Sequence, residues 1–387
     1  MENPYTPSAG SRPPELAGRA AEIAQFNVLI GRLKRGATDQ SMVAKGLRGV
    51  GKTALLNTFE DQAEAAGFLT SYHELTPDTN LVAELVRDSE RCLERLSLGA
   101  SLKKRLRGAL EHMKTISLTG PEGFGFAVDV GGADEGTLSA DLTDLFLQLG
   151  TVAKEKATGI AIFLDELQFV DEVHYRALIS ALHRATQKRL PITVAAAGLP
   201  QIPLLTGEAR SYAERLFDFL TIDNLDDPAA AAALAEPARR CGVEFSDDGL
   251  ERALDWTAGY PFYIQQLGKH AWNLAVSSPI TASDIERAIP AAQDALDKSI
   301  YEVRVQRATE RERLYMRAMA ELGVGPYRSG HVAEKAGLSA TGASPIRRQL
   351  IHKGFVYSTE DYGFVDFTVP RFAEFMRRHM PYQRPSR

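Results

Sequence analysis

The sequence predicts an α/β fold in which helices cover both faces of a parallel sheet, followed by a helical unit and a C-terminal helix-turn-helix unit. Two observations predict it. Strand-like and helix-like segments alternate up to about residue 222, and a glycine-rich stretch lies between a short strand and a helix. Short apolar segments of this kind are typical of strands buried on both faces. The expected strands are 41–45, 68–75, 160–164, 192–197 and 216–222.

The composition is that of an ordinary globular protein and excludes several classes. The chain has 387 residues, enough for two or three domains, and its net charge of -5 does not favour a general nucleic-acid or membrane binder. Its two cysteines, Cys92 and Cys241, suggest neither a disulfide framework nor a metal site, which favours a cytoplasmic setting. With no signal-peptide pattern and no apolar run of about 18 residues, we expect no membrane contact.

Shifts in composition divide the chain into four parts. Residues 1–15 are proline-rich and are expected to form a flexible lead-in to the α/β core at 16–222. Within the core, 116–132 alternate around a Gly-Pro turn and predict a β-hairpin-like insertion, whose lack of basic residues favours subunit contact or a structural role over DNA contact. Residues 223–300 are helical. Residues 301–387 carry 15 Lys and Arg against 9 Asp and Glu, so this unit is basic.

The glycine-rich stretch has the spacing of a phosphate-binding loop, or P-loop. It follows a strand and opens a helix, so its backbone N–H groups and the helix dipole would face phosphate oxygens. Lys52 would reach the β- and γ-phosphates, and the Thr53 hydroxyl would coordinate Mg²⁺. The residues expected to hold the nucleotide here are Gly46, Gly49, Val50, Gly51, Lys52, Thr53 and Ala54.

A second motif supplies the carboxylates that a P-loop needs. The apolar strand at 160–164 ends in Asp165 and Glu166, at the edge where ligands bind in open α/β sheets. Asp165 would hold Mg²⁺, and Glu166 would orient or activate the attacking water. The Asn-Lys-x-Asp motif of GTP-binding proteins is absent, which favours ATP over GTP.

These motifs together resemble the AAA+ P-loop ATPases, in the branch that holds origin-recognition initiators, archaeal-type ATPases and STAND regulatory NTPases. The resemblance covers nearly the whole chain. Gly18 and Arg19 match an N-terminal motif that borders the adenine in that branch, and Pro261 in Gly259-Tyr260-Pro261 matches a proline that packs near the nucleotide. The resemblance implies an ATP hydrolase with a helical lid and a C-terminal winged helix.

Two departures from the family pattern imply turnover that is slow or that waits on a partner. The strand at 192–197 ends without the polar sensor residue of the family, and Phe262 stands where a second sensor, usually arginine, is found. Arg215 matches the position of the arginine finger, which would complete a neighbouring subunit's site in a homo-oligomer or with a protein partner. The alternative for Arg215 is an ion pair with a residue such as Asp218.

The C-terminal unit predicts three helices and a hairpin, the order of a winged helix-turn-helix. Helices are expected at 310–322 and 329–336, and a third is expected to be capped by Ser344 with Pro345 at its first position. Strands at 355–357 and 364–367 would form the wing. The third helix carries the candidate DNA-binding residues Arg347, Arg348, His352 and Lys353.

Three functions remain open at this point. The first is an ATPase that couples its nucleotide state to assembly or to DNA, with the winged helix binding double-stranded DNA through the basic third helix. The second is a STAND-like switch that holds ATP or ADP tightly and uses the winged helix to contact protein or to close itself. The third is a scaffold that binds ATP without turnover, which the intact Lys52, Asp165 and Glu166 disfavour. The acidic wing tip at Glu360 and Asp361 weighs against DNA, and the basic balance of the unit weighs for it.

Overall fold

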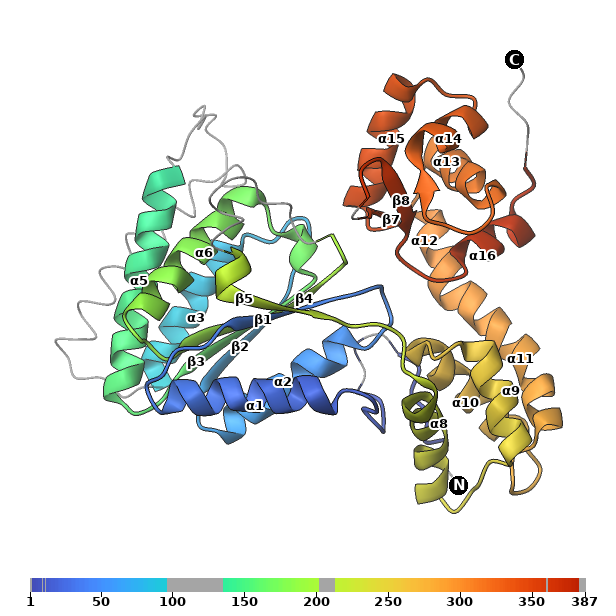
Figure 1. Ribbon diagram of the computed structural model, residues 1–387, viewed down its shortest axis with the longest axis horizontal. Coiled ribbons are helices and arrows are strands. Elements are labelled where there is room, and N and C mark those ends of the chain that lie inside the picture. The colour runs from blue at the N-terminus through green and yellow to red at the C-terminus, as the bar shows by residue number, and fades with distance from the viewer. Residues whose placement is uncertain are drawn as a thin grey trace.

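The protein has an α/β core, a helical lid and a C-terminal domain, which are laid out side by side in Figure 1. The computed structural model describes residues 2–8, 10, 12–95, 135–201, 213–359 and 361–382. The insertion predicted at 116–132 and the segment at 202–212 lie outside the described residues. Within the described part of the chain, no helix is long and apolar enough to cross a membrane.

The core contains one five-stranded sheet in the order β2-β3-β4-β1-β5, with every pair of neighbours parallel. Parallel strands all end at the same edge, so the loops after β1 and β3 come together there. Strand β4 lies between β3 and β1, and β1 pairs with β5 from Ser41↔Phe217 to Lys45↔Thr221. The strands are β1 (Ser41–Lys45), β2 (Leu69–Glu74), β3 (Ile160–Asp165), β4 (Ile192–Gly198) and β5 (Phe217–Thr221).

Helices cover both faces of this sheet, as the sequence predicts. Alternate residues of β1 belong to different cores: Met42 and Ala44 pack with helices α1 and α2, and Val43 packs with helices α3, α5 and α6. This alternation follows from the pleat, which turns successive side chains to opposite faces. The helices are α1 (Ala20–Lys34), α2 (Lys52–Ala65), α3 (Leu81–Arg95), α5 (Glu135–Glu155) and α6 (Glu172–Gln187), and a 3₁₀ turn η1 (Leu167–Phe169) follows β3.

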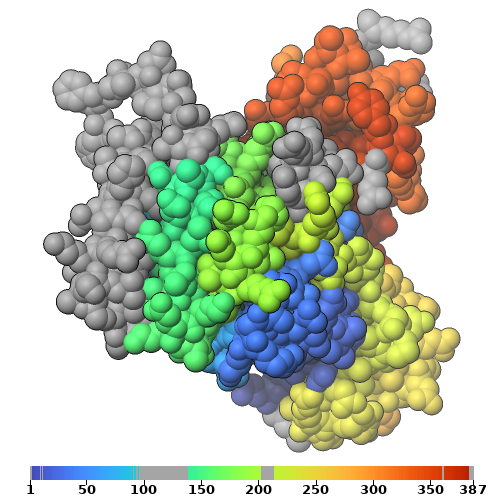
Figure 2. All heavy atoms as spheres, turned by 60° about the vertical axis from the view of Figure 1, so that its left-hand side comes forward, coloured from blue at the N-terminus to red at the C-terminus, as the bar shows by residue number. Residues whose placement is uncertain are grey.

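The lid consists of helices joined by short loops, two of which meet in a single β-bridge between Phe245 and Ile280. Three of its four helices begin at side-chain caps, because the side chains of Asp226, Ser246 and Thr281 each accept an N–H of the first turn. In the space-filling view of Figure 2 the lid, in yellow, is packed against the blue N-terminal part of the core. The lid helices are α8 (Asp227–Arg240), α9 (Asp247–Thr257), α10 (Pro261–Leu274) and α11 (Ala282–Leu296).

The N-terminal lead-in differs from the flexible segment expected at 1–15. The side chain of Tyr5 is 3% exposed and lies in the lid core, and its hydroxyl donates to the carbonyl oxygen of Leu234 at 2.5 Å. The ring fits because helix α10 has glycine at Gly268, where a Cβ would lie 2.6 Å from the Tyr5 ring. Proline content alone did not indicate this anchor, since the anchor depends on a glycine more than 260 residues away.

The C-terminal domain follows the lid through a π-helical turn, η2 (Asp297–Glu302), and the short helix α12 (Val303–Gln306). The first three helices of this domain and its antiparallel sheet in the order β6-β8-β7 are compatible with the winged helix-turn-helix that the sequence predicts. The elements are α13 (Glu310–Glu321), β6 (Tyr327–Arg328), α14 (Ser329–Lys335), α15 (Ala340–His352), β7 (Val356–Ser358), β8 (Phe364–Phe367) and α16 (Phe372–His379).

The predicted start of the third helix is wrong. Helix α15 begins at Ala340, because the Ser339 hydroxyl accepts the Gly342 N–H at 3.1 Å and caps the helix there. Pro345 therefore lies inside the helix, and Ser344 is not its cap. A proline in that position removes one backbone hydrogen bond of the helix. The helix nevertheless begins five residues earlier, at the cap that Ser339 provides.

We expect Phe26→Ala to destabilise the core strongly. Phe26 of α1 is fully buried and its ring stacks on Phe59 of α2 with centroids 4.3 Å apart. Removing a buried ring of this kind costs about 3–5 kcal/mol. Val28 on the same helix is 58% exposed and provides the control, because Val28→Ala should change stability by less than about 0.5 kcal/mol. Urea unfolding followed by circular dichroism measures both, and equal midpoints for the two variants would contradict this packing.

Candidate nucleotide-binding site

The glycine-rich loop joins β1 to α2 at the edge where the parallel strands end. Two of its glycines are required by close contacts. A Cβ on Gly46 would lie 2.2 Å from the carbonyl oxygen of Ile222, and Gly49 has φ of +80° with its Cβ position 2.5 Å from the Tyr260 hydroxyl. The loop is therefore pressed between the end of the core and the lid. Its conformation depends on residues that lie far away in the sequence.

Thr53, Asp165 and Tyr72 form a polar cluster at the start of α2. The Thr53 hydroxyl donates to Asp165 Oδ2 at 2.6 Å, and the Tyr72 hydroxyl donates to the same oxygen at 3.2 Å. Asp165 is only 5% exposed, and its other oxygen accepts the Glu166 N–H at 2.8 Å. Tyr72, in β2, was not predicted as a site residue, because only the parallel pairing of β2 with β3 brings it here.

The oxygen donors of this cluster fit Mg²⁺. Mg²⁺ prefers oxygen ligands and is usually held by one or two protein oxygens, with water and substrate phosphates completing its shell. A hydroxyl and a carboxylate 2.6 Å apart match that requirement. Among the described residues there is no group of three or more His, Cys, Asp or Glu side chains that could hold a metal, so a cage made entirely of protein is not offered there.

Lys52 points into the loop that precedes it. Its Nζ donates to the carbonyl oxygens of Gly46 at 2.9 Å and of Leu47 at 2.7 Å. Burial lowers the pKa of Lys52 to about 8, although Glu166 and Asp165 act in the opposite direction. The ammonium group is therefore bonded to two neutral carbonyl oxygens and, among the described residues, to no anion. Phosphate oxygens would supply the negative charge.

Glu166 has a strained backbone and is held by two neighbours. Its φ of 57° and ψ of 42° lie in the left-handed region, which is unusual for a residue with a side chain and is often found at functional sites. Its carboxylate accepts from Arg48 at 2.7 Å and from the Gln168 side-chain amide. Gln168 Oε1 accepts the Leu199 N–H at 3.0 Å, directly after β4. Gln168 therefore provides a polar group where the end of β4 itself lacks one.

Arg48 connects the three units of the chain. Its N–H donates to the carbonyl oxygen of Thr368 in the C-terminal domain at 3.0 Å, and its carbonyl oxygen accepts the Tyr260 hydroxyl of the lid. The guanidinium lies against Gly354, since a Cβ there would be 2.9 Å from one of its nitrogens. A second contact joins the core to the C-terminal domain, because Gln201 Oε1 accepts the Ser358 N–H at 2.6 Å.

Three residues predicted from the N-terminal motif and the lid lie around the loop. The Arg19 guanidinium is 6% exposed and donates to the carbonyl oxygens of Val50 at 3.2 Å and of Asp223 at 2.5 Å, so it supports the loop through its backbone. Burial lowers the Arg19 pKa. Gly18 packs on Ala229 of the lid, and Pro261 begins α10, directly after the Tyr260 that contacts Arg48.

Arg304 is a charged residue near Arg48 and Glu166 that the sequence analysis did not identify. It lies in α12, and its pKa is lowered to about 10, first by burial and then by the nearby Arg48, while Tyr260 and Glu166 oppose the shift. Among the described residues, its guanidinium has no hydrogen-bond or ion-pair partner. No sequence motif marks Arg304. Only the path of the chain between lid and C-terminal domain brings it to the loop.

Arg215 does not contribute to the site of its own chain. It precedes β5, whose first residue pairs with Ser41 at the beginning of β1. The P-loop follows the other end of β1, so Arg215 lies at the opposite edge of the sheet, where it is exposed. Its carbonyl oxygen accepts from Gln40, and Asp218 accepts from the Gln25 side chain.

The four candidate DNA-binding residues differ in their surroundings. Arg347 donates to the Ser329 hydroxyl at 3.0 Å, and Lys353 pairs with the buried carboxylate of Glu312 at 2.8 Å. Arg348 and His352 are exposed. Two of the four are therefore engaged within the domain. The helix that carries them ends two residues before Gly354, which contacts Arg48.

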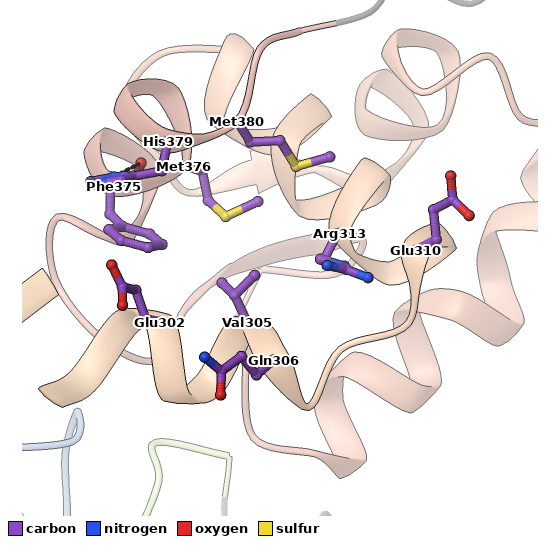
Figure 3. Close-up of a pocket in the computed structure, with 9 residues that line it drawn as sticks. All are labelled: Glu302, Val305, Gln306, Glu310, Arg313, Phe375, Met376, His379 and Met380. Atoms are coloured by element: carbon purple, nitrogen blue, oxygen red, sulfur yellow. Dashed lines mark hydrogen bonds between the residues drawn. The ribbon is translucent and has the colours of Figure 1, made fainter. Parts of the chain in front are cut away.

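The C-terminal domain also has a pocket of about 460 Å³ apart from the P-loop. Figure 3 shows Phe375 and Met376 on one side of it, and Val305 and Gln306 on the other. Its remaining lining residues are Glu302, Glu310, Arg313, His379 and Met380. None of these residues belongs to the loop, the carboxylate motif or the lid contact, so this pocket is separate from the nucleotide site.

Comparisons with known proteins agree with this geometry. Residues 15–195 match the family model described as AAA ATPase domain, and residues 298–376 match a domain of unknown function, DUF8462. No curated protein matches the sequence. The fold is similar to that of the Walker-type ATPase of Pyrococcus abyssi, with a TM-score of 0.55 and 13% identity over 94% of this chain and 96% of that chain.

Two further solved structures are similar over most of their length. The ORC1 protein of Aeropyrum pernix, solved in complex with DNA, has a TM-score of 0.48 and 16% identity over 96% of this chain and 95% of that chain. The RuvB Holliday junction branch migration motor of Thermotoga maritima has a TM-score of 0.46 and 16% identity over 96% and 99%. The family match, the parallel sheet and the P-loop geometry agree that residues 15–195 have the fold of an AAA ATPase domain.

Proposed function

We propose that this protein binds ATP with Mg²⁺ in the P-loop, hydrolyses it slowly, and passes the nucleotide state to its C-terminal domain. The contact of Arg48 with both Glu166 and Thr368 is the observation that carries the proposal. It joins the catalytic carboxylate to the domain through a single loop residue. A change at the phosphates would therefore reach both at once.

The chemistry is divided among residues of the core. The loop N–H groups and Lys52 would bind the phosphates, while Thr53 and Asp165 would hold Mg²⁺. Bound Mg²⁺ supplies charge neutralisation at the phosphate oxygens. Glu166 would orient the attacking water and accept its proton, which requires that its carboxylate be free of Arg48 and Gln168. We infer slow turnover from these two contacts, since both must be broken first.

Two hypotheses for the function of the C-terminal domain remain, and they differ in the partner that the domain binds. In the first, the domain binds duplex DNA through α15, for which Arg348 and His352 are exposed. In the second, it acts as an ATP-gated switch that contacts protein. Arg347 and Lys353 are bonded within the domain, and the domain itself is bonded to the P-loop through Thr368 and Arg48. Both observations favour the second hypothesis. The sequence alone favoured neither.

Two further parts of the proposal concern assembly and compartment. Arg215 would complete the site of a neighbouring copy or partner, since it is exposed at the edge away from its own P-loop. Both cysteines are free thiols, Cys92 buried and Cys241 partly exposed, which suits a reducing cytoplasm.

We expect Glu166→Gln to abolish most ATP hydrolysis while leaving ATP binding intact. Removal of a general base lowers turnover by about 100-fold or more. Steady-state phosphate release with Mg²⁺, with and without duplex DNA, measures the effect. Glu172→Gln is the matched control, because Glu172 is an exposed acid that pairs with Arg176 on α6. Equal rates for wild type and Glu166→Gln would exclude Glu166 from the reaction.

We expect the variant Arg348→Ala to separate the two readings of the C-terminal domain. If α15 reads DNA, duplex affinity should fall by roughly 10-fold, because each good arginine contact is worth about 1–3 kcal/mol. The duplex affinity of the double variant Arg347→Ala/Arg348→Ala should fall further. Arg311→Ala, at an exposed position on α13, is the control. Duplex affinity that is absent, or equal in all four proteins at physiological salt, leaves the protein-contacting switch.

ATP binding should be accompanied by proton uptake at pH 8.5. With the Lys52 pKa lowered to about 8, roughly three-quarters of the free protein carries a neutral Lys52 at that pH. Phosphate oxygens raise that pKa and draw a proton in, whereas at pH 7 Lys52 is already mostly charged. Titration calorimetry in buffers of different ionisation enthalpy measures the uptake. Lys52→Arg should take up none, and equal uptake at both pH values would contradict the assignment.

A further inference from the structure

Tyr72 lies on the strand beside the carboxylate motif and is bonded to that motif. Its hydroxyl donates to Asp165 Oδ2 at 3.2 Å, and the Thr53 hydroxyl donates to the same oxygen at 2.6 Å. An ionised carboxylate can only accept, so both hydroxyl groups act as donors. Tyr72 belongs to neither sequence motif, and the hydrolysis proposed above uses neither its ring nor its hydroxyl.

The pairing of β2 with β3 explains how Tyr72 reaches Asp165. Strand β2 lies at one end of the strand order, next to β3, and Tyr72 is opposite Phe163 in the parallel register. Asp165 follows Phe163 by two residues, so their side chains project from the same face of the sheet. Helices α1 and α2 cover this face, because Phe163 packs in their core. The phenol, the carboxylate and Thr53 at the start of α2 therefore meet on one face.

The ring of Tyr72 is held by packing, which fixes the direction of its hydroxyl. It stacks on the ring of Phe163, with centroids 6.5 Å apart and an interplanar angle of 16°. Phe163 is fully buried and contacts the ring of Phe26 in turn, at a centroid distance of 6.1 Å. Replacing Tyr72 by phenylalanine would therefore remove the hydroxyl while keeping the aromatic packing.

The carboxylate of Asp165 is bonded at both oxygens. Oδ1 accepts the Glu166 N–H at 2.8 Å, and Oδ2 accepts the hydroxyl groups of Thr53 and Tyr72. Asp165 is also 5% exposed, so water does not readily replace a lost partner. The carboxylate cannot turn about its Cβ–Cγ bond without breaking these contacts. Hydrogen bonds that orient a metal ligand in this way are typically worth about 10- to 100-fold in metal affinity.

We propose that Tyr72 is a positioning residue of the magnesium site, which holds the Asp165 carboxylate toward Thr53 and so favours Mg²⁺ over Ca²⁺. This inference rests on the proposed binding of ATP with Mg²⁺ in the P-loop. Mg²⁺ keeps several of its waters and needs few protein oxygens, whereas Ca²⁺ takes about six to eight oxygen ligands and often binds a carboxylate through both oxygens. A carboxylate fixed at both oxygens suits the first cation better than the second.

Binding of a non-hydrolysable ATP analogue to the full-length protein tests this inference without relying on turnover. Its dissociation constant is measured by calorimetry in Mg²⁺, in Ca²⁺ and in EDTA. For Tyr72→Phe we expect the constant in Mg²⁺ to rise roughly 10-fold, toward its metal-free value, and the constants in Ca²⁺ and EDTA to change by less than about 3-fold. Tyr362→Phe, at a fully exposed tyrosine, is the matched control and should behave as wild type.

A double-variant cycle separates positioning from general packing. If Tyr72 acts through Asp165, then Tyr72→Phe should have no further effect on binding in Mg²⁺ once the protein carries Asp165→Asn. If the hydroxyl only supports the fold, the two losses should add. The cycle also decides the case in which Tyr72→Phe lowers the unfolding midpoint, because additive losses there are the contrary result.

The outcomes distinguish this inference from the proposal on which it rests. Wild type that binds no ATP analogue in any condition overturns the P-loop proposal and this inference with it. Wild type with equal affinity in Mg²⁺ and EDTA overturns the magnesium site, and with it the role of Tyr72. If wild type binds more tightly in Mg²⁺, two results contradict the role of Tyr72 alone: Tyr72→Phe that equals wild type, or Tyr72→Phe that loses the same affinity in Mg²⁺ and Ca²⁺.

Discussion

The backbone of Arg48 is where the core, the lid and the C-terminal domain meet. Its N–H donates to the carbonyl oxygen of Thr368 and its carbonyl oxygen accepts the Tyr260 hydroxyl, so both backbone polar groups of this one residue are bonded to other domains. A phosphate-binding loop needs its N–H groups directed at the ligand, and here one of them is directed at a protein carbonyl. The arrangement of the lid and the C-terminal domain therefore depends on the same short loop that would hold the nucleotide.

In this site, contacts within the protein compete with phosphate for the same cationic side chains. Lys52 donates to loop carbonyl oxygens and Arg48 donates to Glu166, and these contacts satisfy the two cations only in part when no nucleotide is bound. Phosphates would offer the same cations stronger partners, because hydrogen bonds between ionised groups are about twice as strong as neutral ones. The free energy of nucleotide binding would then be reduced by the cost of breaking these internal contacts. That cost is the physical basis for coupling between nucleotide and domains.

Further contacts, away from the P-loop, hold the C-terminal domain to the lid. The hydroxyl groups of Tyr263 and Tyr301 both donate to the carbonyl oxygen of Pro370, at 2.8 and 2.9 Å, two residues after Thr368. Arg371 lies over the ring of Trp256 in the lid, 5.2 Å from its centroid, and donates to its carbonyl oxygen. The segment at 368–371 is thus fastened to the lid as well as to the P-loop. A displacement at Arg48 would be transmitted through this segment rather than through the exposed face of α15.

The sequence by itself determined the parts that depend on local pattern. Apolar runs and glycine spacing identified the five strands of the core sheet, the P-loop, and the carboxylates Asp165 and Glu166, since each rests on residues close together in the chain. Tertiary structure alone decided which distant side chains surround them. Tyr72 and Gln168 reach the site through strand pairing and a 3₁₀ turn, and neither of these leaves a periodic signal. The same holds for Tyr5, whose buried place depends on the space above Gly268. Burial and charge compensation act between residues far apart, so a single local window of sequence cannot contain them.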